Sequence, residues 1–259
     1  MNLHTQHLDI GYQKRRIVED LNLSIPEGKI TALIGANGSG KSTILKTLCR
    51  IMEPTAGEVL LDGKDIHKMD SRKLARIISI LPQNPEAPEG LTVEELVGYG
   101  RAPYSKGFGS LKAEDKEKIR WALEVTNMTE FADRPVDQLS GGQRQRAWIA
   151  MCVAQDTETV FLDEPTTFLD IAFQLEIMKM LEKLNREYGK TIIMVVHDLN
   201  HASQYADHIV AIKSGKITAQ GNPAQVITEE NLQNIYGVRA DIFTDQRTGK
   251  PVCIPFDIM

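Results

Sequence analysis

Residues 29–43 read KITALIGANGSGKST, and this stretch decides the fold class of the chain. Residues 29–34 form a short apolar run, which is typical of a buried strand. Residues 35–42 fit the pattern GxxxxGK[ST], a glycine-rich loop that lets backbone N–H groups approach phosphate oxygens. Residues 42–52 then place apolar side chains on one face of a helix. Strand, loop and helix follow in the order of a nucleotide-phosphate loop, so we predict an α/β protein.

The chemistry of this loop indicates a nucleoside triphosphate. The loop leads into a helix N-terminus, whose partial positive charge favours anions. Lys41 can reach the β- and γ-phosphates, and the hydroxyl of Ser42 can bind Mg²⁺. The predicted ATP-binding residues of the loop are Gly35, Ala36, Asn37, Gly38, Ser39, Gly40, Lys41, Ser42 and Thr43.

A pair of carboxylates ends a second apolar run, residues 160–164, which reads VFLDE. A carboxylate at the end of a buried parallel strand is expected near the phosphate loop. We expect Asp163 to bind Mg²⁺, directly or through water. Glu164 can polarise the attacking water as a general base. The alternative is that Glu164 only caps the turn before Pro165.

Further short apolar runs alternate with helical patterns, which predicts a largely parallel sheet. The predicted strands are residues 77–81, 159–162 and 191–196, with alternation at 21–25, a helix at 174–188 and a hairpin of 209–212 with 216–219. The predicted fold is a P-loop NTPase core with a mixed, largely parallel sheet, an N-terminal antiparallel β region and an inserted α-helical subdomain.

The middle of the chain has few strand candidates. It opens with a proline-rich stretch, NPEAPEG, and continues into a charged helical stretch, KAEDKEKIRWALEVT, whose charges indicate a solvated face. We therefore expect a helical subdomain over residues 84–155. Residues 1–83 and 156–259 would form the nucleotide-binding core with a C-terminal tail, for which the sequence gives no clear pattern.

Composition bounds the class of protein. The 259 residues carry 30 Lys and Arg against 35 Asp and Glu, a net charge of −5, which argues against a broad nucleic-acid surface. No apolar run approaches the roughly 20 residues of a membrane span, and the N-terminus has no signal-peptide pattern. The three cysteines lie far apart, so we expect buried thiols rather than a disulfide framework.

Residues 139–143 read LSGGQ. Alone, this could be an N-cap with a flexible start. With the phosphate loop and the VFLDE strand, it resembles the signature of the ABC ATPases. The resemblance implies that two chains form a two-fold dimer, in which each signature closes over ATP held by the other chain. The residues expected to act on the partner's ATP are Ser140, Gly141, Gly142, Gln143 and Asp170.

Three more residues match elements of that family one at a time. Tyr12 lies where the family stacks an aromatic ring on adenine, although a strand-end tyrosine is the alternative. Gln83 matches a glutamine that contacts Mg²⁺ and the attacking water, and His197 matches a histidine that contacts the γ-phosphate. The expected catalytic residues are therefore Glu164, His197, Gln83 and Lys41, and the expected Mg²⁺ ligands are Ser42, Gln83 and Asp163. Thr167 replaces the usual serine of the loop before Asp170 and keeps the hydroxyl.

Residues 197–201, HDLNH, offer a competing motif, because two histidines four apart also occur in zinc proteases. The motif follows a β-rich run rather than lying within a long helix, so we expect no zinc site. We expect His201 to be an ordinary helix-surface residue.

Several stretches resemble the ATPase subunits of iron(III)-siderophore importers, among them TTFLDIAFQLEIM. This resemblance implies an ATP-hydrolysing peripheral subunit at the cytoplasmic face of the membrane, acting with polytopic permease subunits and, through them, an extracytoplasmic binding protein. Importers of haem or vitamin B12, an exporter subunit and a non-transport ABC ATPase are the alternatives. The expected permease-facing surface uses Leu91, Val93, Leu96, Val97, Tyr99 and Tyr104, with Arg101 as a polar anchor. The alternative is that Leu96 and Val97 face the core of the helical subdomain.

Overall fold

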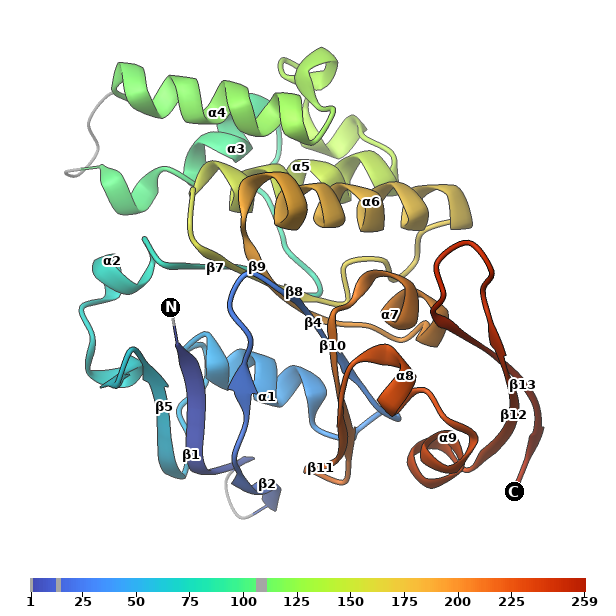
Figure 1. Cartoon of the computed structure of the whole chain (residues 1–259). Helices are drawn as coiled ribbons and strands as arrows, with labels where there is room; N and C mark the ends of the chain where they lie inside the picture. Colours follow the sequence, from blue (N-terminus) through green and yellow to red (C-terminus); the bar gives the residue numbers. More distant parts are fainter. Residues whose placement is uncertain (1, 13–14, 106–110) are drawn as a thin grey trace. The chain divides into compact units, whose positions relative to one another are not determined.

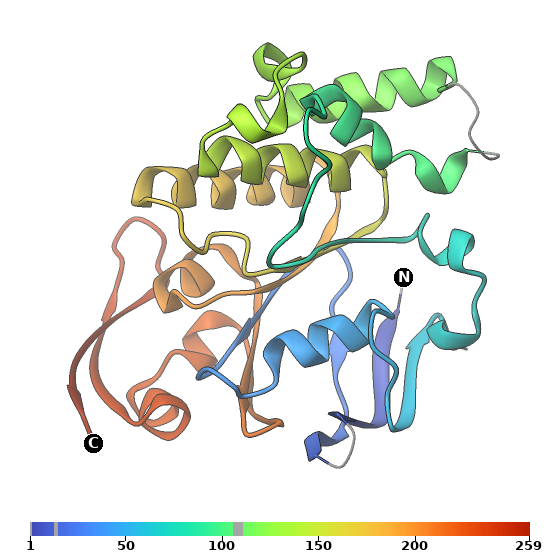
Figure 2. The same ribbon diagram turned by 180° about the vertical axis from the view of Figure 1, so that it is seen from behind.

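The computed structural model describes residues 2–12, 15–105 and 111–259, which form two compact units. The first unit consists of Met1–Met69 and Thr191–Met259, and the second of Asp70–Lys190. Figures 1 and 2 show the elements of both from opposite sides. The predicted subdomain of residues 84–155 lies within the second unit, and its exact division from the core remains a prediction.

The first unit contains parallel strands that carry the phosphate loop. β4 (Ile30–Ile34) pairs in parallel with β9 (Thr191–Val195) and with β10 (His208–Lys213). β11 (Lys216–Gly221) pairs antiparallel with β10 and completes the predicted hairpin. Every residue of β4 and β9 is buried, as expected of continuous apolar runs in a parallel sheet. α1 (Lys41–Leu48) follows β4 and is shorter than the predicted 42–52 helix.

The first unit also contains the predicted N-terminal antiparallel region. β1 (Leu3–Tyr12) pairs with β2 (Arg15–Leu21), β3 (Ser24–Ile25) and β5 (Ala56–Leu61), and β6 (Lys64–Asp65) pairs with β5. The alternating residues of 21–25 are buried as expected. They do not form one strand, because they span the end of β2 and the whole of β3.

The second unit combines two parallel strands with a set of helices. β7 (Ile78–Leu81) pairs in parallel with β8 (Thr159–Asp163). α5 (Gly141–Ala154) packs against α3 (Val93–Tyr99), α4 (Ala113–Val125) and α6 (Ile171–Tyr188), and both views show α5 and α6 side by side. Shorter elements complete the unit: α2 (Ser71–Leu74), η2 (Ala102–Tyr104), η3 (Thr129–Phe131) and η4 (Val136–Gln138).

A buried ion pair ties these helices together. The guanidinium of Arg101 is 3% exposed, donates from Nε to Asp115 at 2.9 Å and donates from Nη1 to the carbonyl of Ala154 at 2.8 Å. Burial alone would raise the pKa of Asp115, but Arg101 and the Lys112 N–H outweigh it and hold that pKa below its ordinary value. The N-terminus of α4 is therefore anchored to the end of α5.

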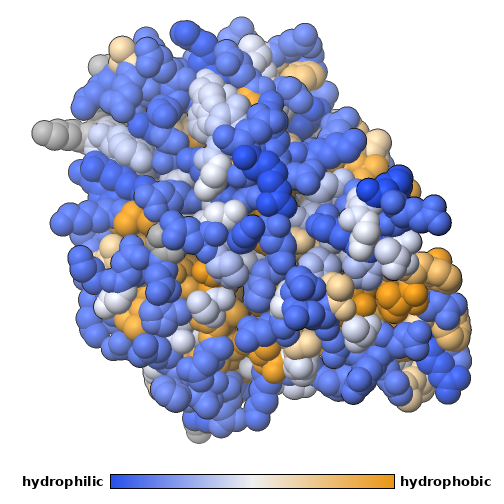
Figure 3. Space-filling model, viewed as in Figure 1, coloured by the Kyte–Doolittle hydropathy of each residue, from blue (hydrophilic) through white to orange (hydrophobic). Residues whose placement is uncertain are grey.

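The C-terminal tail, which had no clear sequence pattern, forms α8 (Pro223–Val226), α9 (Glu229–Tyr236) and a hairpin of β12 (Val238–Thr244) and β13 (Pro251–Ile258). The side-chain amide of Asn200 on α7 (Leu199–Tyr205) bonds both the N–H and the C=O of Cys253. Hydrophobic side chains gather over this hairpin in Figure 3, and Phe256 is 61% exposed.

Across residues 2–12, 15–105 and 111–259, no helix has both the length and the apolar character needed to cross a membrane.

Candidate functional site

The phosphate loop needs glycine at specific positions. Gly35 has φ 149°, and a Cβ atom there would lie 2.1 Å from the carbonyl oxygen of Ile212. Gly40 has φ 105° and forms the N-cap of α1. Neither backbone suits a residue with a side chain. The pattern seen in the sequence is therefore a requirement of this turn between β4 and α1.

The side chain of Lys41 folds back onto the loop that precedes it. It is 5% exposed, and its Nζ donates to the carbonyl oxygens of Gly35 at 2.8 Å and Ala36 at 3.0 Å. Ser42 lies in the first turn of α1, which carries no acidic residue. The loop thus combines a buried cation, a helix N-terminus and a hydroxyl, a combination suited to a phosphate chain.

The first unit brings His197 to the same sheet edge as the phosphate loop. β4 and β9 are parallel, with Leu33 opposite Val195. Gly35 and His197 each lie two positions beyond this pair, and the carboxyl ends of parallel strands share one edge of a sheet. His197 is solvent-exposed there. His197 and the phosphate loop therefore lie at one edge of the sheet, and the contact of His197 with the γ-phosphate stays a prediction.

The second unit repeats this arrangement with Gln83 and Glu164. β7 and β8 are parallel, with Leu81 opposite Leu162. The side-chain amide of Gln83, two positions beyond, donates from Nε2 to Oε2 of Glu164 at 2.7 Å. Asp163, the last residue of β8, is 1% exposed. Two carboxylates and an amide thus gather at one strand edge.

Glu164 has an unusual backbone. Its φ is 57°, a left-handed conformation that is uncommon for a residue with a side chain and that often occurs at functional sites. The N–H of Thr167 donates to the carbonyl oxygen of Glu164 at 3.3 Å and closes a turn. A role for Glu164 in that turn explains the backbone bond, but it does not explain the bond between its carboxylate and Gln83.

The LSGGQ segment forms the start of α5 in the second unit. Ser140 is the N-cap, its Oγ accepts from the N–H of Gln143, and the Gln143 side chain accepts from the N–H of Ser140. A Cβ atom on Gly142 would lie 2.4 Å from the ring of Phe173. The serine and glutamine therefore fix the helix start, and Gly142 allows α6 to pack closely against it.

Asp170 and Tyr12 occupy the ends of their elements. Asp170 caps α6 and accepts from the N–H of Phe173 at 3.0 Å. Tyr12 is the last residue of β1 and is 53% exposed. Its ring is accessible, and its predicted contact with adenine remains a prediction, as do the ligand roles of the other site residues.

The ABC transporter family matches this chain over residues 18–167, and this matched segment is more than half of the chain. The chain belongs to the ABC transporter family. It is 56% identical over 258 residues to the "Iron(3+)-hydroxamate import ATP-binding protein FhuC" of Bacillus subtilis, with 100% of this chain and 96% of that protein covered.

Solved structures agree with this ABC assignment. A chain from an inward-facing transporter ascribed to the metal-chelate type superposes with a TM-score of 0.85 at 27% identity, covering 98% of this chain and 96% of that one. The dimeric ATP-binding cassette MJ0796, bound to ADP and Pi, gives 0.74 at 30% identity, with 85% of this chain and 98% of that chain covered. The fold is that of an ABC ATPase.

The structure corrects part of the predicted permease-facing surface of this ABC ATPase. Val93, Leu96 and Val97 are fully buried in the core around α3, so they cannot face a partner. Arg101 is an internal anchor paired with Asp115, not a surface one. Tyr99, at 52% exposed, remains accessible.

The prediction that His201 lies on the helix surface is also wrong. It is 8% exposed rather than a surface residue, and its ring lies edge-on to Tyr205. α7 begins at Leu199, so His197 precedes the helix and the two histidines do not share a helical face. The residues that the structure describes contain no cluster of three or more His, Cys, Asp or Glu side chains suited to a metal ion.

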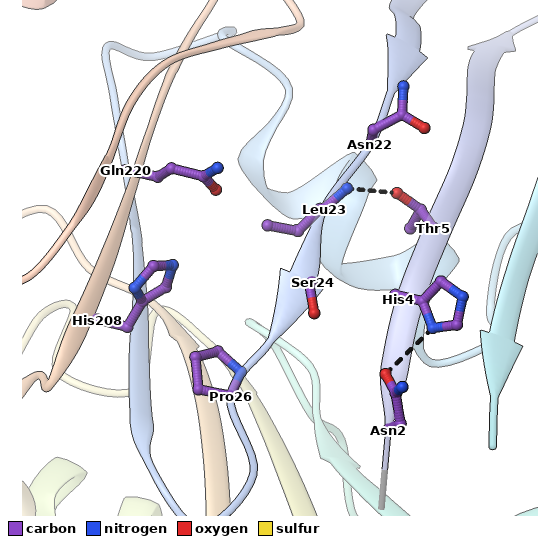
Figure 4. A pocket seen from close by; sticks show the side chains of 9 residues that line it. All are labelled: Asn2, His4, Thr5, Asn22, Leu23, Ser24, Pro26, His208 and Gln220. Carbon is purple, nitrogen blue, oxygen red and sulfur yellow. Dashed lines mark hydrogen bonds between the residues drawn. The ribbon is translucent and has the colours of Figure 1, made fainter.

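A wide hollow of about 790 Å³ opens elsewhere in the first unit (Figure 4). Figure 4 shows His208 and Gln220 on one side and His4 and Asn2 on the other. The described residues that line it include no lysine or arginine, and burial lowers the pKa of His208, which disfavours the charged form of that ring. The hollow therefore does not suit a triphosphate, unlike the loop around Lys41.

Proposed function

We propose that the chain is the ATP-hydrolysing, energy-coupling subunit of an ABC importer for iron(III)-siderophore complexes. The observation that carries this proposal is the hydrogen bond from Gln83 to Glu164, because it orients a carboxylate beside the buried Asp163 at a strand end. The relative that imports iron(3+)-hydroxamate, similar over the whole chain, supports the ligand class.

ATP binds at the phosphate loop in this proposal. The backbone N–H groups of residues 35–43 face the phosphates, Lys41 exchanges its carbonyl partners for the β- and γ-phosphates, and the exposed ring of Tyr12 stacks on adenine. The absence of acidic side chains from the first turn of α1 favours this polyanion.

The donor set suits Mg²⁺. Ser42, Gln83 and Asp163 offer a hydroxyl, an amide oxygen and a carboxylate, which are the hard oxygen ligands that Mg²⁺ prefers. Such an ion would neutralise phosphate charge. Glu164 orients and deprotonates the attacking water as a general base, and His197 contacts the γ-phosphate from the strand next to the loop.

A second copy of the chain completes the site. The N-terminus of α5, with Ser140, Gly141, Gly142 and Gln143, forms the anion-binding element that contacts ATP held by the partner, and Asp170 faces the partner from the start of α6. The dimeric cassette among the solved structures supports this arrangement.

A hollow of about 300 Å³ in the second unit offers a docking place for the permease. It is lined by residues 85–89, which follow Gln83, and by Val136, Asp137, Arg144 and Trp148. A segment held there would contact the chain within a few residues of Gln83, which links permease movement to the carboxylate of Glu164. The subunit would then lie at the cytoplasmic face of the membrane, and the extracytoplasmic binding protein would reach it only through the permease.

Transport assays test this proposal. The chain is co-expressed with the permease subunits of a ferric-hydroxamate importer, purified and reconstituted in proteoliposomes with the binding protein. We expect ATP-dependent uptake of ferric hydroxamate, with little uptake of haem or cobalamin and none with Glu164→Gln. Uptake of haem or cobalamin instead would reassign the cargo, and failure to hydrolyse ATP would overturn the enzymatic assignment.

A further inference from the structure

One oxygen of Glu164 accepts two hydrogen bonds. Oε2 accepts from Nε2 of Gln83 at 2.7 Å and from the hydroxyl of Thr167 at 3.1 Å. Two donors that reach the same oxygen from different segments restrict the rotation of the carboxylate more than either donor would alone. The carboxylate of Glu164 is therefore held in one orientation by its surroundings.

The turn does not need the hydroxyl of Thr167. The backbone N–H of Thr167 already closes the turn on the carbonyl oxygen of Glu164 at 3.3 Å. The preceding residue, Thr166, has the same side chain but makes no side-chain hydrogen bond among the residues described. The hydroxyl of Thr167 thus makes a contact beyond what the turn requires, and that contact goes to the carboxylate.

The loop that carries Thr167 is itself fixed at its far end. Asp170 caps α6, and the backbone carbonyl of Leu169 accepts from Nε2 of Gln174 on α6 at 3.0 Å. Thr167 is only two residues from this hydrogen-bonded segment, so its hydroxyl has a defined position from which to hold Glu164.

We propose that Thr167 is a positioning residue for ATP hydrolysis. It acts through Glu164, because its hydroxyl orients the carboxylate that polarises the attacking water. A base misaligned by a fraction of an ångström loses rate without loss of substrate binding. This inference rests on the proposed function, since it requires Glu164 to be the general base.

Two variants of Thr167 test the role of the hydroxyl. Thr167→Val keeps the branched shape and removes the donor, whereas Thr167→Ser keeps the donor. For Thr167→Val we expect kcat to fall about tenfold, the scale of one hydrogen bond to a charged group, with KM and ATP affinity within about twofold of the wild type. Thr167→Ser should restore kcat to within about threefold.

Thr166→Val is the matched control, with the same change one residue earlier, and thermal unfolding is measured for all variants. An unchanged kcat in Thr167→Val overturns the inference. A loss of kcat in Thr167→Val that Thr167→Ser fails to restore also overturns it, and so does an equal loss of kcat in Thr166→Val. A lowered melting temperature of Thr167→Val overturns it as well, because each of these results points to a structural role. A wild-type chain without ATPase activity would instead overturn the proposed function.

Discussion

Gln83 and Glu164 are 81 positions apart in the sequence, yet the amide of the first donates to the carboxylate of the second at 2.7 Å. The contact exists because β7 and β8 run in parallel and end at the same level. Any movement of the segment after β7 therefore reaches the carboxylate directly. This gives the ATPase a short path between residues 85–89 and its proposed base.

Replacing Glu164 by Gln should nearly stop turnover while leaving ATP bound. The amide cannot accept the proton from water, and loss of a general base costs about 100-fold or more in kcat. Steady-state phosphate release and nucleotide binding by calorimetry measure the two effects. The control is Glu158→Gln, an exposed carboxylate just before β8. Steady-state hydrolysis at the wild-type rate in Glu164→Gln would refute the assignment of the base.

Replacing Lys41 by Ala should weaken ATP binding. The variant removes the one buried ammonium that the phosphate loop holds at the carbonyls of Gly35 and Ala36. We expect a loss of at least about tenfold, the scale of a charge-assisted hydrogen bond. Calorimetric titration with ATP measures it, and Lys64→Ala, on the surface of β6, is the control. Equal affinity in both variants would contradict the phosphate-loop assignment.

Replacing Phe168 by Ser should weaken the ATP-bound dimer. Its side chain is 94% exposed, and its φ is 63°, so an aromatic ring stands in water two residues before Asp170. Burying such a ring against a second copy would contribute about 2 kcal/mol, or roughly thirtyfold in the dissociation constant. Sedimentation of Glu164→Gln with ATP, with and without the change, measures it. Phe256→Ser on the C-terminal hairpin is the control, and an unaltered dimer would remove Phe168 from the interface.

Replacing Arg101 by Met should destabilise the second unit at neutral pH. It leaves the buried carboxylate of Asp115 without its partner, and breaking such a pair costs about 3–5 kcal/mol. In the wild type the pKa of Asp115 is lowered, so the pair stabilises the fold above the ordinary carboxyl pKa and is lost as pH falls through the lowered value.

In Arg101→Met, burial is no longer opposed by the guanidinium and favours the neutral carboxyl of Asp115. The unpaired charge is then relieved as the pH falls, so the difference in stability between the wild type and Arg101→Met should shrink. Denaturant unfolding at pH 7 and pH 4 measures this, and Arg72→Met, at an exposed position on α2, is the control. A deficit that is the same at both values would show that lost packing, rather than the unpaired charge, destabilises the variant.

Replacing Gly142 by Ala should destabilise the start of α5, because the new Cβ atom would lie 2.4 Å from the ring of Phe173. We expect a loss of about 1–3 kcal/mol. The neighbouring Gly141→Ala is the control, since its Cβ atom would meet only Leu169 at 3.8 Å. Thermal unfolding measures the loss of stability in both variants. Adding Phe173→Leu should recover part of the loss in Gly142→Ala but should not stabilise Gly141→Ala.

Much of this fold could be predicted because its strands are continuous apolar runs. β4, β8 and β9 are each buried throughout, and each run ends close to a candidate site residue. Because the carboxyl ends of parallel strands lie at one edge of a sheet, site residues far apart in the sequence could be expected to lie close together. What the sequence could not supply was the bond from Thr167 to Glu164, since a hydroxyl has several partners within reach of any turn.

Other features of the structure could not be predicted from the sequence, and each has a physical reason. The spacing of Val93, Leu96 and Val97 fits a buried helix face, which was the alternative for Leu96 and Val97, but the same spacing also fits an apolar docking surface. Arg101 is buried because Asp115 neutralises it, a long-range pairing that no local pattern reveals. The hairpin of β12 and β13 was missed because its exposed apolar residues obscure the alternation of buried and exposed positions.

That hairpin has a consequence for the behaviour of the chain at high concentration. Among the described residues it is a two-stranded sheet, and such an edge can recruit strands from other molecules and seed aggregation. Pro251 and Pro255 lack N–H donors, and the backbone of Cys253 between them is occupied by Asn200. The side chain of Asn200 thus occupies, from a different segment of the chain, backbone groups with which an incoming strand would otherwise pair.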